Sequence, residues 1–287
     1  MSASATAPRR LVVTADDFGV ALAVNEAVEQ AHRHGLLTAA SLMVTGDAAA
    51  DAVRRARAMP TLGVGLHLVL VEGRPALPAH RVPALVDSSG RFRPDMIGAA
   101  IAIFARPAAR RQLAAEIDAQ FAAFAATGLA LDHVNAHKHF HLHPTIAATL
   151  LRVGRRYGMR AVRAPVEPRA VIAAIEPGAA ARFNVARYMA ARLRRRLRAA
   201  GMLVPDHVFG LAWSGRFDAE RLRALLARLP EGLSEIYFHP ATDDRYLGHA
   251  PGYAYRGELA ALTDAAALRA AAPLVRGAFA DVAGAVG

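Results

Sequence analysis

Five of the twelve histidines of this 287-residue chain lie within eleven consecutive positions. The stretch LALDHVNAHKHFHLHP, residues 129–144, carries them on odd numbers only: His133, His137, His139, His141 and His143. Alternate side chains of a β-strand point to the same face, so a strand here presents imidazoles on one face and apolar side chains on the other. Imidazole nitrogens bind divalent metals, and they also hydrogen-bond inside polar interiors. For any single histidine both interpretations stay open, whereas the cluster as a whole favours a metal site.

Three other apolar segments end in residues that could bind a metal or move a proton. Asp16 and Asp17 end LVVTADDFG, His67 lies within GLHLVL, and His239 ends SEIYFHPAT. Two adjacent carboxylates repel each other unless a cation or an arginine divides their roles. One Asp and two His are a common ligand set for a catalytic divalent ion, with positions left for water and substrate. The alternatives are a helix-capping aspartate and a His67 that is only a hydrogen-bonded core residue.

The elements that must position these residues alternate between strands and helices along the chain. Seven apolar segments of strand length are separated by segments with helical spacing, and the predicted strands are 11–19, 37–46, 62–73, 133–143, 161–168, 207–215 and 234–242. Such alternation predicts parallel strands covered by helices. We expect an α/β fold, a seven-stranded (β/α) TIM-like barrel that is either closed or distorted and incompletely closed, with a doubly wound open sheet as the alternative. Barrels of this kind build their active sites at the carboxyl ends of the strands.

Length and composition suit one domain over residues 1–287, with a basic helical insertion at about 168–205. Apolar residues make up 54% of the chain, which is enough for a sizeable core. The absence of cysteine excludes disulfides and thiolate metal sites. The apolar run Leu11–Val13 is too short for the core of a signal peptide, and no stretch has the length of a membrane span. We therefore expect a cytoplasmic protein.

The formal net charge is +11, and every basic residue except Lys138 is an arginine. Residues 182–198, RFNVARYMAARLRRRLR, hold seven arginines and no acid. On a helical wheel the apolar residues of this segment share one side: Phe183, Ala186, Met189, Ala190, Leu193 and Leu197. A basic amphipathic helix is typical of a membrane-surface element, and packing of its apolar side on a barrel is an equal alternative. Nucleic-acid binding is a third interpretation of this charge.

Four motifs, in this order and at this spacing, resemble those of one enzyme family. TADDFG, GLHL, NAHKHFHLH and EIYFHPAT look like the motifs of the YdjC-like carbohydrate deacetylases, over Leu11 to about Leu268. The wording VNAHKHFHLHPT is most similar to the hopanoid-biosynthesis deacetylase branch. Many relatives have Asp-Ser where this chain has Asn135-Ala136, so roles known for that Asp and Ser do not transfer.

The resemblance implies a seven-stranded β/α barrel that holds a single divalent metal ion. By motif, the ligands are Asp17, His67 and His137. Zn²⁺ is the expected ion, with Mg²⁺, Mn²⁺, Ni²⁺ or Co²⁺ as alternatives, because Asp and His ligands suit several of them.

The same resemblance implies roles for five further residues. Asp16 is the expected catalytic base, His239 the general acid, and Arg163, in VRAP, resembles an arginine that holds the base. His139 and His141 are expected to line the substrate pocket. Hydrolysis of an amide needs an activated water and a protonated leaving amine, which a base and an acid of these types can supply. No nucleophile elbow is present, since GLAWSG lacks that motif.

The resemblance also implies a substrate and its surroundings. The expected reaction removes the N-acetyl group from an N-acetylglucosaminyl lipid, N-acetylglucosaminyl bacteriohopanetetrol, at the inner face of the cytoplasmic membrane. Peripheral contact would run through residues 182–198, and a homodimer is expected. The alternatives are a deacetylase of soluble chitin-type oligosaccharides and a non-enzymatic basic protein that binds nucleic acid. Both deacetylase interpretations, with a lipid-linked or a soluble substrate, exclude nucleic acid as a partner.

Overall fold

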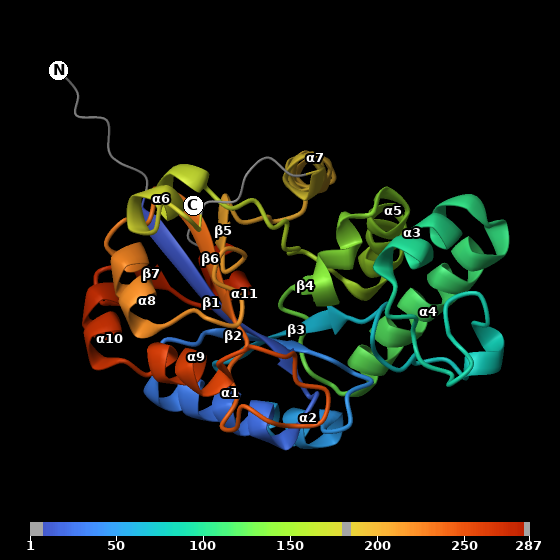
Figure 1. Cartoon of the computed structure of the whole chain (residues 1–287), viewed down its shortest axis with the longest axis horizontal. Coiled ribbons are helices and arrows are strands. Elements are labelled where there is room, and N and C mark those ends of the chain that lie inside the picture. Colours follow the sequence, from blue (N-terminus) through green and yellow to red (C-terminus); the bar gives the residue numbers. More distant parts are fainter. Residues whose placement is uncertain (1–7, 180–184, 284–287) are drawn as a thin grey trace.

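The computed structural model describes residues 8–179 and 185–283, and seven parallel strands within them form one curled sheet (Figure 1). The strands are β1 (Arg9–Phe18), β2 (Ala39–Leu42), β3 (Gly63–Leu68), β4 (Val134–Ala136), β5 (His207–Phe209), β6 (Gly232–Phe238) and β7 (Val275–Arg276). They pair in the order β4-β3-β2-β1-β6-β5, and the short β7 pairs with β1. The long β1 is therefore central, and its carboxyl end lies between those of β2 and β6.

The sheet closes only part of the way round, because its edge strands β4 and β5 do not pair with each other. An extended segment, residues 160–166, lies between them. The Val134 amide donates to the Ala161 carbonyl at 2.9 Å, and the Val208 amide donates to the Val166 carbonyl at 3.1 Å. The predicted strand 161–168 does not form as a strand, since Pro165 and Pro168 have no N–H to donate to a ladder. The prediction of an incompletely closed seven-stranded barrel is confirmed.

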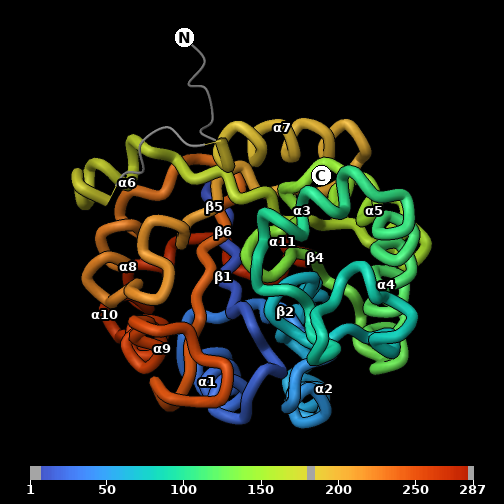
Figure 2. The backbone as a smooth tube through the Cα atoms, turned by 45° about the vertical axis from the view of Figure 1, so that its right-hand side comes forward, coloured from blue at the N-terminus to red at the C-terminus, as the bar shows by residue number. Residues whose placement is uncertain are grey.

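Helices cover the outside of the curled sheet, as Figure 2 shows. Their bounds are α1 (Leu22–His34), α2 (Ala49–Arg57), α3 (Met96–Ala105), α4 (Pro107–Ala126), α5 (Pro144–Gly154), α6 (Arg169–Ile175), α7 (Val185–Ala199), α8 (Ala219–Leu226), α9 (Tyr255–Leu262), α10 (Ala265–Ala271) and α11 (Phe279–Ala283). Short 3-10 turns cover Ala79–Arg81, His137–Leu142 and Arg155–Tyr157. One large apolar core joins the strands to these helices.

The histidine segment differs from the continuous strand that its alternation predicts. The strand ends at Ala136, and His137–Leu142 form a tight turn instead. Lys138 and His139 have φ angles of 52° and 53°, in the left-handed region that a strand never enters. The prediction of one strand to residue 143 is therefore wrong beyond Ala136, because two consecutive left-handed residues reverse the chain before Pro144 opens α5.

The arginine-rich segment forms α7, and its apolar side packs on the rest of the protein. Ala190, Leu193 and Leu197 are buried, the last two in the main core. Residues 182–184 of the predicted helix, Phe183 included, lie outside the described part of the chain. In the described ranges no helix is both long and apolar enough to cross a membrane.

Candidate metal and catalytic site

The end of β1 turns two adjacent carboxylates toward one pocket. In a regular strand neighbouring side chains point to opposite faces. Here the register of β1 against β2 shifts between Ala15 and Phe18, and Asp17 has a φ of 61°. This irregularity lets both Asp16 and Asp17 line the same pocket of about 720 Å³. A left-handed backbone costs a non-glycine residue about 1 kcal/mol or more, and such strain concentrates at functional sites.

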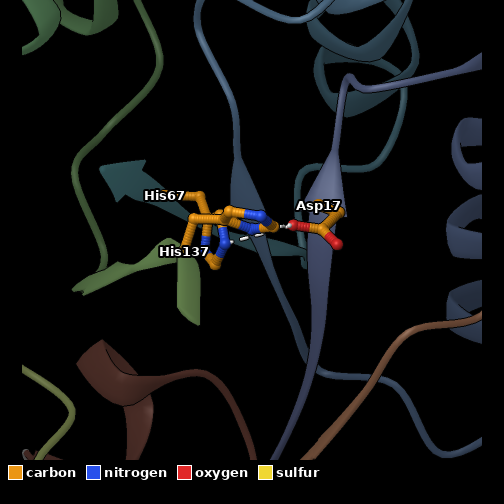
Figure 3. A group of neighbouring side chains, drawn as sticks. All are labelled: Asp17, His67 and His137. Carbon is orange, nitrogen blue, oxygen red and sulfur yellow. Dashed lines mark hydrogen bonds and ion pairs between the residues drawn. The ribbon is translucent and has the colours of Figure 1, made fainter. Parts of the chain in front are cut away.

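Asp17, His67 and His137 meet at the carboxyl ends of β1, β3 and β4. One ligand atom from each lies within 4.8 Å of the other two. Asp17 Oδ1 is 3.2 Å from His67 Nε2 and 3.1 Å from His137 Nδ1. Figure 3 shows the imidazoles of His67 and His137 next to each other, both facing the carboxylate of Asp17. Three different strand ends therefore supply a compact Asp-His-His set, as a divalent ion requires.

Hydrogen bonds on its far side prepare His67 to bind a metal. The Asn135 amide donates through Nδ2 to Asp16 Oδ1 and Ser41 Oγ, both at 2.9 Å, so its Oδ1 is the acceptor. That oxygen lies 2.6 Å from His67 Nδ1, which must therefore carry the proton. The remaining nitrogen, Nε2, is buried and makes no hydrogen bond. A lone pair fixed in this way and aimed at Asp17 fits a metal ligand.

A second set of charges lies below the ligands, in the interior of the barrel. Asp16 Oδ2 accepts from Arg163 Nη1 at 2.5 Å, and Asp16 Oδ1 accepts from Arg163 Nη2 at 3.0 Å. The same guanidinium donates through Nε and Nη2 to Glu235 Oε1 at 2.9 and 2.7 Å. Thr14 also donates to that oxygen, at 2.9 Å. One buried arginine thus holds Asp16 from below and is itself held by Glu235.

The two aspartates remain ionised for different reasons. Burial acts to raise the pKa of Asp16, but the charge and hydrogen bonds of Arg163 outweigh it and hold that pKa well below its usual range. Burial also acts on Asp17, where His137 and His67 lower the pKa instead. Asp16 therefore owes its charge to a permanent cation, whereas Asp17 owes its charge to two imidazoles that a metal ion could recruit.

The loop after β6 brings His239 to the lining of the same pocket. Its ring lies edge-on to Tyr237 and Tyr253, at centroid distances of 5.7 and 5.5 Å, and its Nδ1 has no hydrogen-bond partner. The His239 amide donates to Glu258 Oε2 of α9 at 2.5 Å. Glu258 is fully buried and also accepts from the Phe217 amide, so α9 fixes where this loop begins.

Comparison with known proteins agrees with this geometry. The model of the family described as YdjC-like protein matches residues 10–272. The chain belongs to the YdjC-like protein family. It is 31% identical over 260 residues to the carbohydrate deacetylase of Geobacillus stearothermophilus, a match covering 90% of each protein. It is 42% identical over 148 residues to the carbohydrate deacetylase of Brevibacillus brevis, covering 52% of this chain and 56% of that relative.

A crystal structure has the same fold as this YdjC-like protein. It is that of an Enterococcus faecalis protein proposed to be a cellobiose-phosphate cleavage protein. The TM-score is 0.75 at 25% sequence identity, and the match covers 96% of this chain and 99% of the other. The family assignment agrees with the resemblance drawn from the four motifs; the finer resemblance to a hopanoid branch stays a prediction.

The structure of this YdjC-like protein brings most of the predicted site residues together. The three predicted ligands line the pocket, and so do Asp16, His139 and His239. Arg163 contacts Asp16 from below. His141 is fully buried, bonds through Nε2 to the Arg163 carbonyl at 2.8 Å, and is not among the residues that line the pocket. We therefore place His141 as a support of Arg163 and not as a substrate contact.

Three supporting residues of the site, Ser41, Glu235 and Glu258, are not predicted from the sequence, and Asn135 is marked there only as a departure from the family motif. Asn135 and Ser41 hold the carboxylate of Asp16, Glu235 holds Arg163, and Glu258 holds the loop of His239. A usable signal existed for Glu235, which is an acid within the apolar strand SEIYF. The other contacts join residues far apart in the sequence, which no local pattern reveals.

Proposed function

We propose that this YdjC-like protein is a metal-dependent carbohydrate deacetylase that removes the N-acetyl group of an N-acetylglucosamine-containing substrate. The observation that carries the proposal is the triad of Asp17, His67 and His137, with Asp16 and His239 lining the same pocket. The named relatives, both carbohydrate deacetylases, support the reaction type.

The proposed metal fits the donor set because His67 offers an unpaired, buried Nε2 and Asp17 an ionised carboxylate. A divalent ion bound there supplies a Lewis acid that polarises the amide carbonyl and makes a water molecule more acidic. Asp16 accepts the proton of the attacking water. Its low pKa makes it a weak base, so it is ionised before the water attacks, is neutral while it holds the proton, and passes the proton on readily.

His239 supplies the proton that the departing amine needs. Its Nδ1 is free of hydrogen bonds, and the residue lines the same pocket as the triad. A protonated imidazole can donate to the departing nitrogen, as a general acid must. Glu258 holds the backbone amide of His239, and Tyr237 and Tyr253 restrict how far the ring can turn.

The walls of the pocket suit a sugar larger than one ring. Tyr246, Tyr253 and Tyr255 line the pocket, and the ring of Tyr255 lies 5.0 Å from that of Tyr246 and 5.4 Å from that of Tyr253. Glu72 and Lys138, which pair with each other, also line it. Apolar aromatic walls with a few polar groups are typical of small-molecule sites, and a volume of about 720 Å³ falls in their range.

Two forms of this substrate remain as proposals. The first is the lipid-linked N-acetylglucosaminyl bacteriohopanetetrol, handled at the inner face of the cytoplasmic membrane by a homodimer that contacts lipid through the arginines of α7. The second is a soluble chitin-type oligosaccharide. The lipid form is supported by the motif VNAHKHFHLHPT and by the exposed cationic side of α7, where Arg192, Arg195 and Arg196 are exposed.

Acetate release is the test of the proposed reaction. The protein is incubated with N-acetylglucosaminyl bacteriohopanetetrol and with N,N′-diacetylchitobiose, with and without a chelator. We expect chelator-sensitive acetate from at least one substrate, and the preferred one decides between the two forms. His239→Ala should lower kcat about 100-fold and remove one limb of the pH–rate profile. Release from neither substrate, or release that the chelator leaves unchanged, contradicts the proposal.

A further inference from the structure

Helix α3 exposes a stripe of large apolar side chains to solvent. Ile97, Ile101 and Phe104 are 76%, 61% and 70% exposed, the highest values for isoleucine and phenylalanine in the described ranges. Single exposed apolar residues are common on protein surfaces, whereas contiguous ones mark interaction sites. Figure 1 shows α3 at the right-hand edge of the molecule, outside the sheet.

The three side chains lie on one face of the helix. Their spacing of four and then three residues confines them to an arc of about 60° at 100° per residue. Ala102 and Ile103, on the opposite face, are buried and fix α3 to the core. The helix is thus held in place by one apolar face and offers a second one outward, where no described part of the chain covers it.

Arginines border this stripe where α3 meets α4. Arg106, Arg110 and Arg111 are exposed. None of the three has a carboxylate within ion-pair distance in the described part of the chain. The nearest acid along α3, Asp95, already accepts from the Ile97 and Gly98 amides as the helix cap. The border of the stripe is therefore positive and uncompensated.

We propose that the stripe of Ile97, Ile101 and Phe104, with the bordering arginines, docks the protein on an anionic lipid surface. Apolar side chains that enter the headgroup region and arginines that pair with lipid phosphates are the two components of peripheral binding. A second copy of the chain is a poor occupant, because each copy carries +11 and would bring the same unpaired arginines to the contact.

The basic helix α7 provides the contrast. It carries more arginines than the corner of α3 and α4, but its leucines are buried in the protein. Of its large apolar residues, Val185 and Tyr188 are the exposed ones, at 67% and 57%. Headgroup attraction alone is weaker and more salt-sensitive than attraction combined with inserted side chains. The proposal therefore assigns the main lipid contact to α3, and α7 supplies at most charge.

The test is co-sedimentation of the full chain with vesicles of phosphatidylcholine alone or mixed with phosphatidylglycerol. The double variant Ile101→Gln, Phe104→Gln removes the stripe at exposed positions that the fold does not use. Val185→Gln, Tyr188→Gln on α7 is the matched control. We expect binding to the anionic vesicles only, at least a tenfold loss in the α3 variant, and binding close to wild type in the control.

Three outcomes overturn the inference: absence of vesicle binding by the wild type, an α3 variant that binds like the wild type, and loss of binding in the α7 control instead. A fourth is a wild-type dimer that the α3 variant dissociates in sedimentation velocity, since the stripe would then be covered by a second copy. Acetate release from a soluble substrate should be equal in all variants, so failure here is separate from failure of the proposed reaction.

Discussion

The mouth and the floor of the pocket use similar residues in opposite ways. At the mouth, Asp17 and His137 are partly exposed, Asp17 is strained, and His67 keeps an unpaired nitrogen. At the floor, the side chains of Asp16 and Arg163 are at most 3% exposed and joined by short hydrogen bonds. At the mouth the ligand nitrogen of His67 has no hydrogen-bond partner, whereas at the floor Asp16 and Arg163 are paired with each other. This difference indicates that the mouth binds a ligand and that the floor holds Asp16 in position.

The charges of the floor are paired only as a group, and Glu235 Oε2 has no hydrogen-bond partner in the described part of the chain. Arg163 is one cation between two carboxylates, and neutral donors share the rest of the charge: Thr14, Ser41 and Asn135. Burying a charge is costly unless it is paired, and removing one partner leaves the other uncompensated. Changes at the floor should therefore disturb the position of Asp16 or the fold, whereas changes at the mouth should disturb metal binding and leave the fold intact.

The largest effect is expected at the mouth. His137→Ala should reduce acetate release to the uncatalysed level, a loss of about 1000-fold or more, because only two ligands remain to hold the ion. The side chain is 21% exposed, so its truncation leaves no large buried cavity. Thermal unfolding within a few degrees of wild type is the control; residual activity near the wild-type rate would remove the distinction between mouth and floor.

A smaller but still large effect is expected when Asp16 is neutralised. Asp16→Asn keeps an acceptor for Ser41 and leaves Arg163 paired with Glu235, so the protein should fold. It cannot accept a proton, and kcat should fall on the order of 100-fold with KM little changed. Steady-state kinetics on the preferred substrate measure this. A normal kcat would show that Asp16 only supports the ligands and is not the base.

Asn135 connects the mouth to the floor, because it bonds both His67 and Asp16. Its substitution therefore sharpens the comparison between the two regions. Asn135→Leu removes the acceptor that fixes the proton on His67 Nδ1. Partners of metal-bound histidines typically contribute 10- to 100-fold to affinity, so we expect the metal to bind about tenfold more weakly. Competition with a calibrated chelator measures the affinity. Asn135→Asp, which keeps an acceptor for His67, is the matched control and should bind more tightly than the leucine variant.

The smallest effect concerns Glu167, which belongs neither to the mouth nor to the floor. Glu167 accepts the Gly210 and Leu211 amides at 3.0 Å, and burial raises its pKa from 4.5 to about 7. The folded protein therefore holds a proton that the unfolded chain has released, and this contribution to stability is present below pH 4.5 and lost as the pH rises through 7. Between pH 5 and pH 8 this loss should lower the free energy of unfolding of the wild type by on the order of 2 kcal/mol, and Glu167→Gln should abolish that decrease. Urea unfolding at pH 5 and pH 8 measures it, and identical declines in both proteins would refute it.

The sequence predicts the outline of the fold and the chemistry of the site, but not its supports. Alternating apolar segments are a local signal, and they predict six of the strands, β1 to β6. The predicted strand 161–168 does not form, and β4 and β5 end earlier than predicted, at Ala136 and Phe209. The bend at Lys138 and His139 depends on two residues in the left-handed region. Neither is a glycine, so the local sequence gives no signal for the bend. The family resemblance predicts His141 as a residue of the substrate pocket, whereas in the turn of His137–Leu142 its Nε2 bonds to the Arg163 carbonyl.

The pairs of Arg163 with Glu235 and of Asn135 with His67 connect residues 72 and 68 positions apart. Only the packing of the barrel creates them. The exposed stripe of α3 is equally invisible in the sequence, where MIGAAIAIFA has the composition of a buried helix.

Metal titration of the chelator-treated protein tests the central claim most directly. One series of isothermal titration calorimetry with Zn²⁺, on the wild type, Asp16→Asn and His137→Ala, separates the floor from the mouth. We predict one ion per chain for the wild type and for Asp16→Asn, and no measurable binding for His137→Ala. Binding of one ion with unchanged affinity by His137→Ala, or of none by the wild type, would contradict the account of the mouth as a metal site.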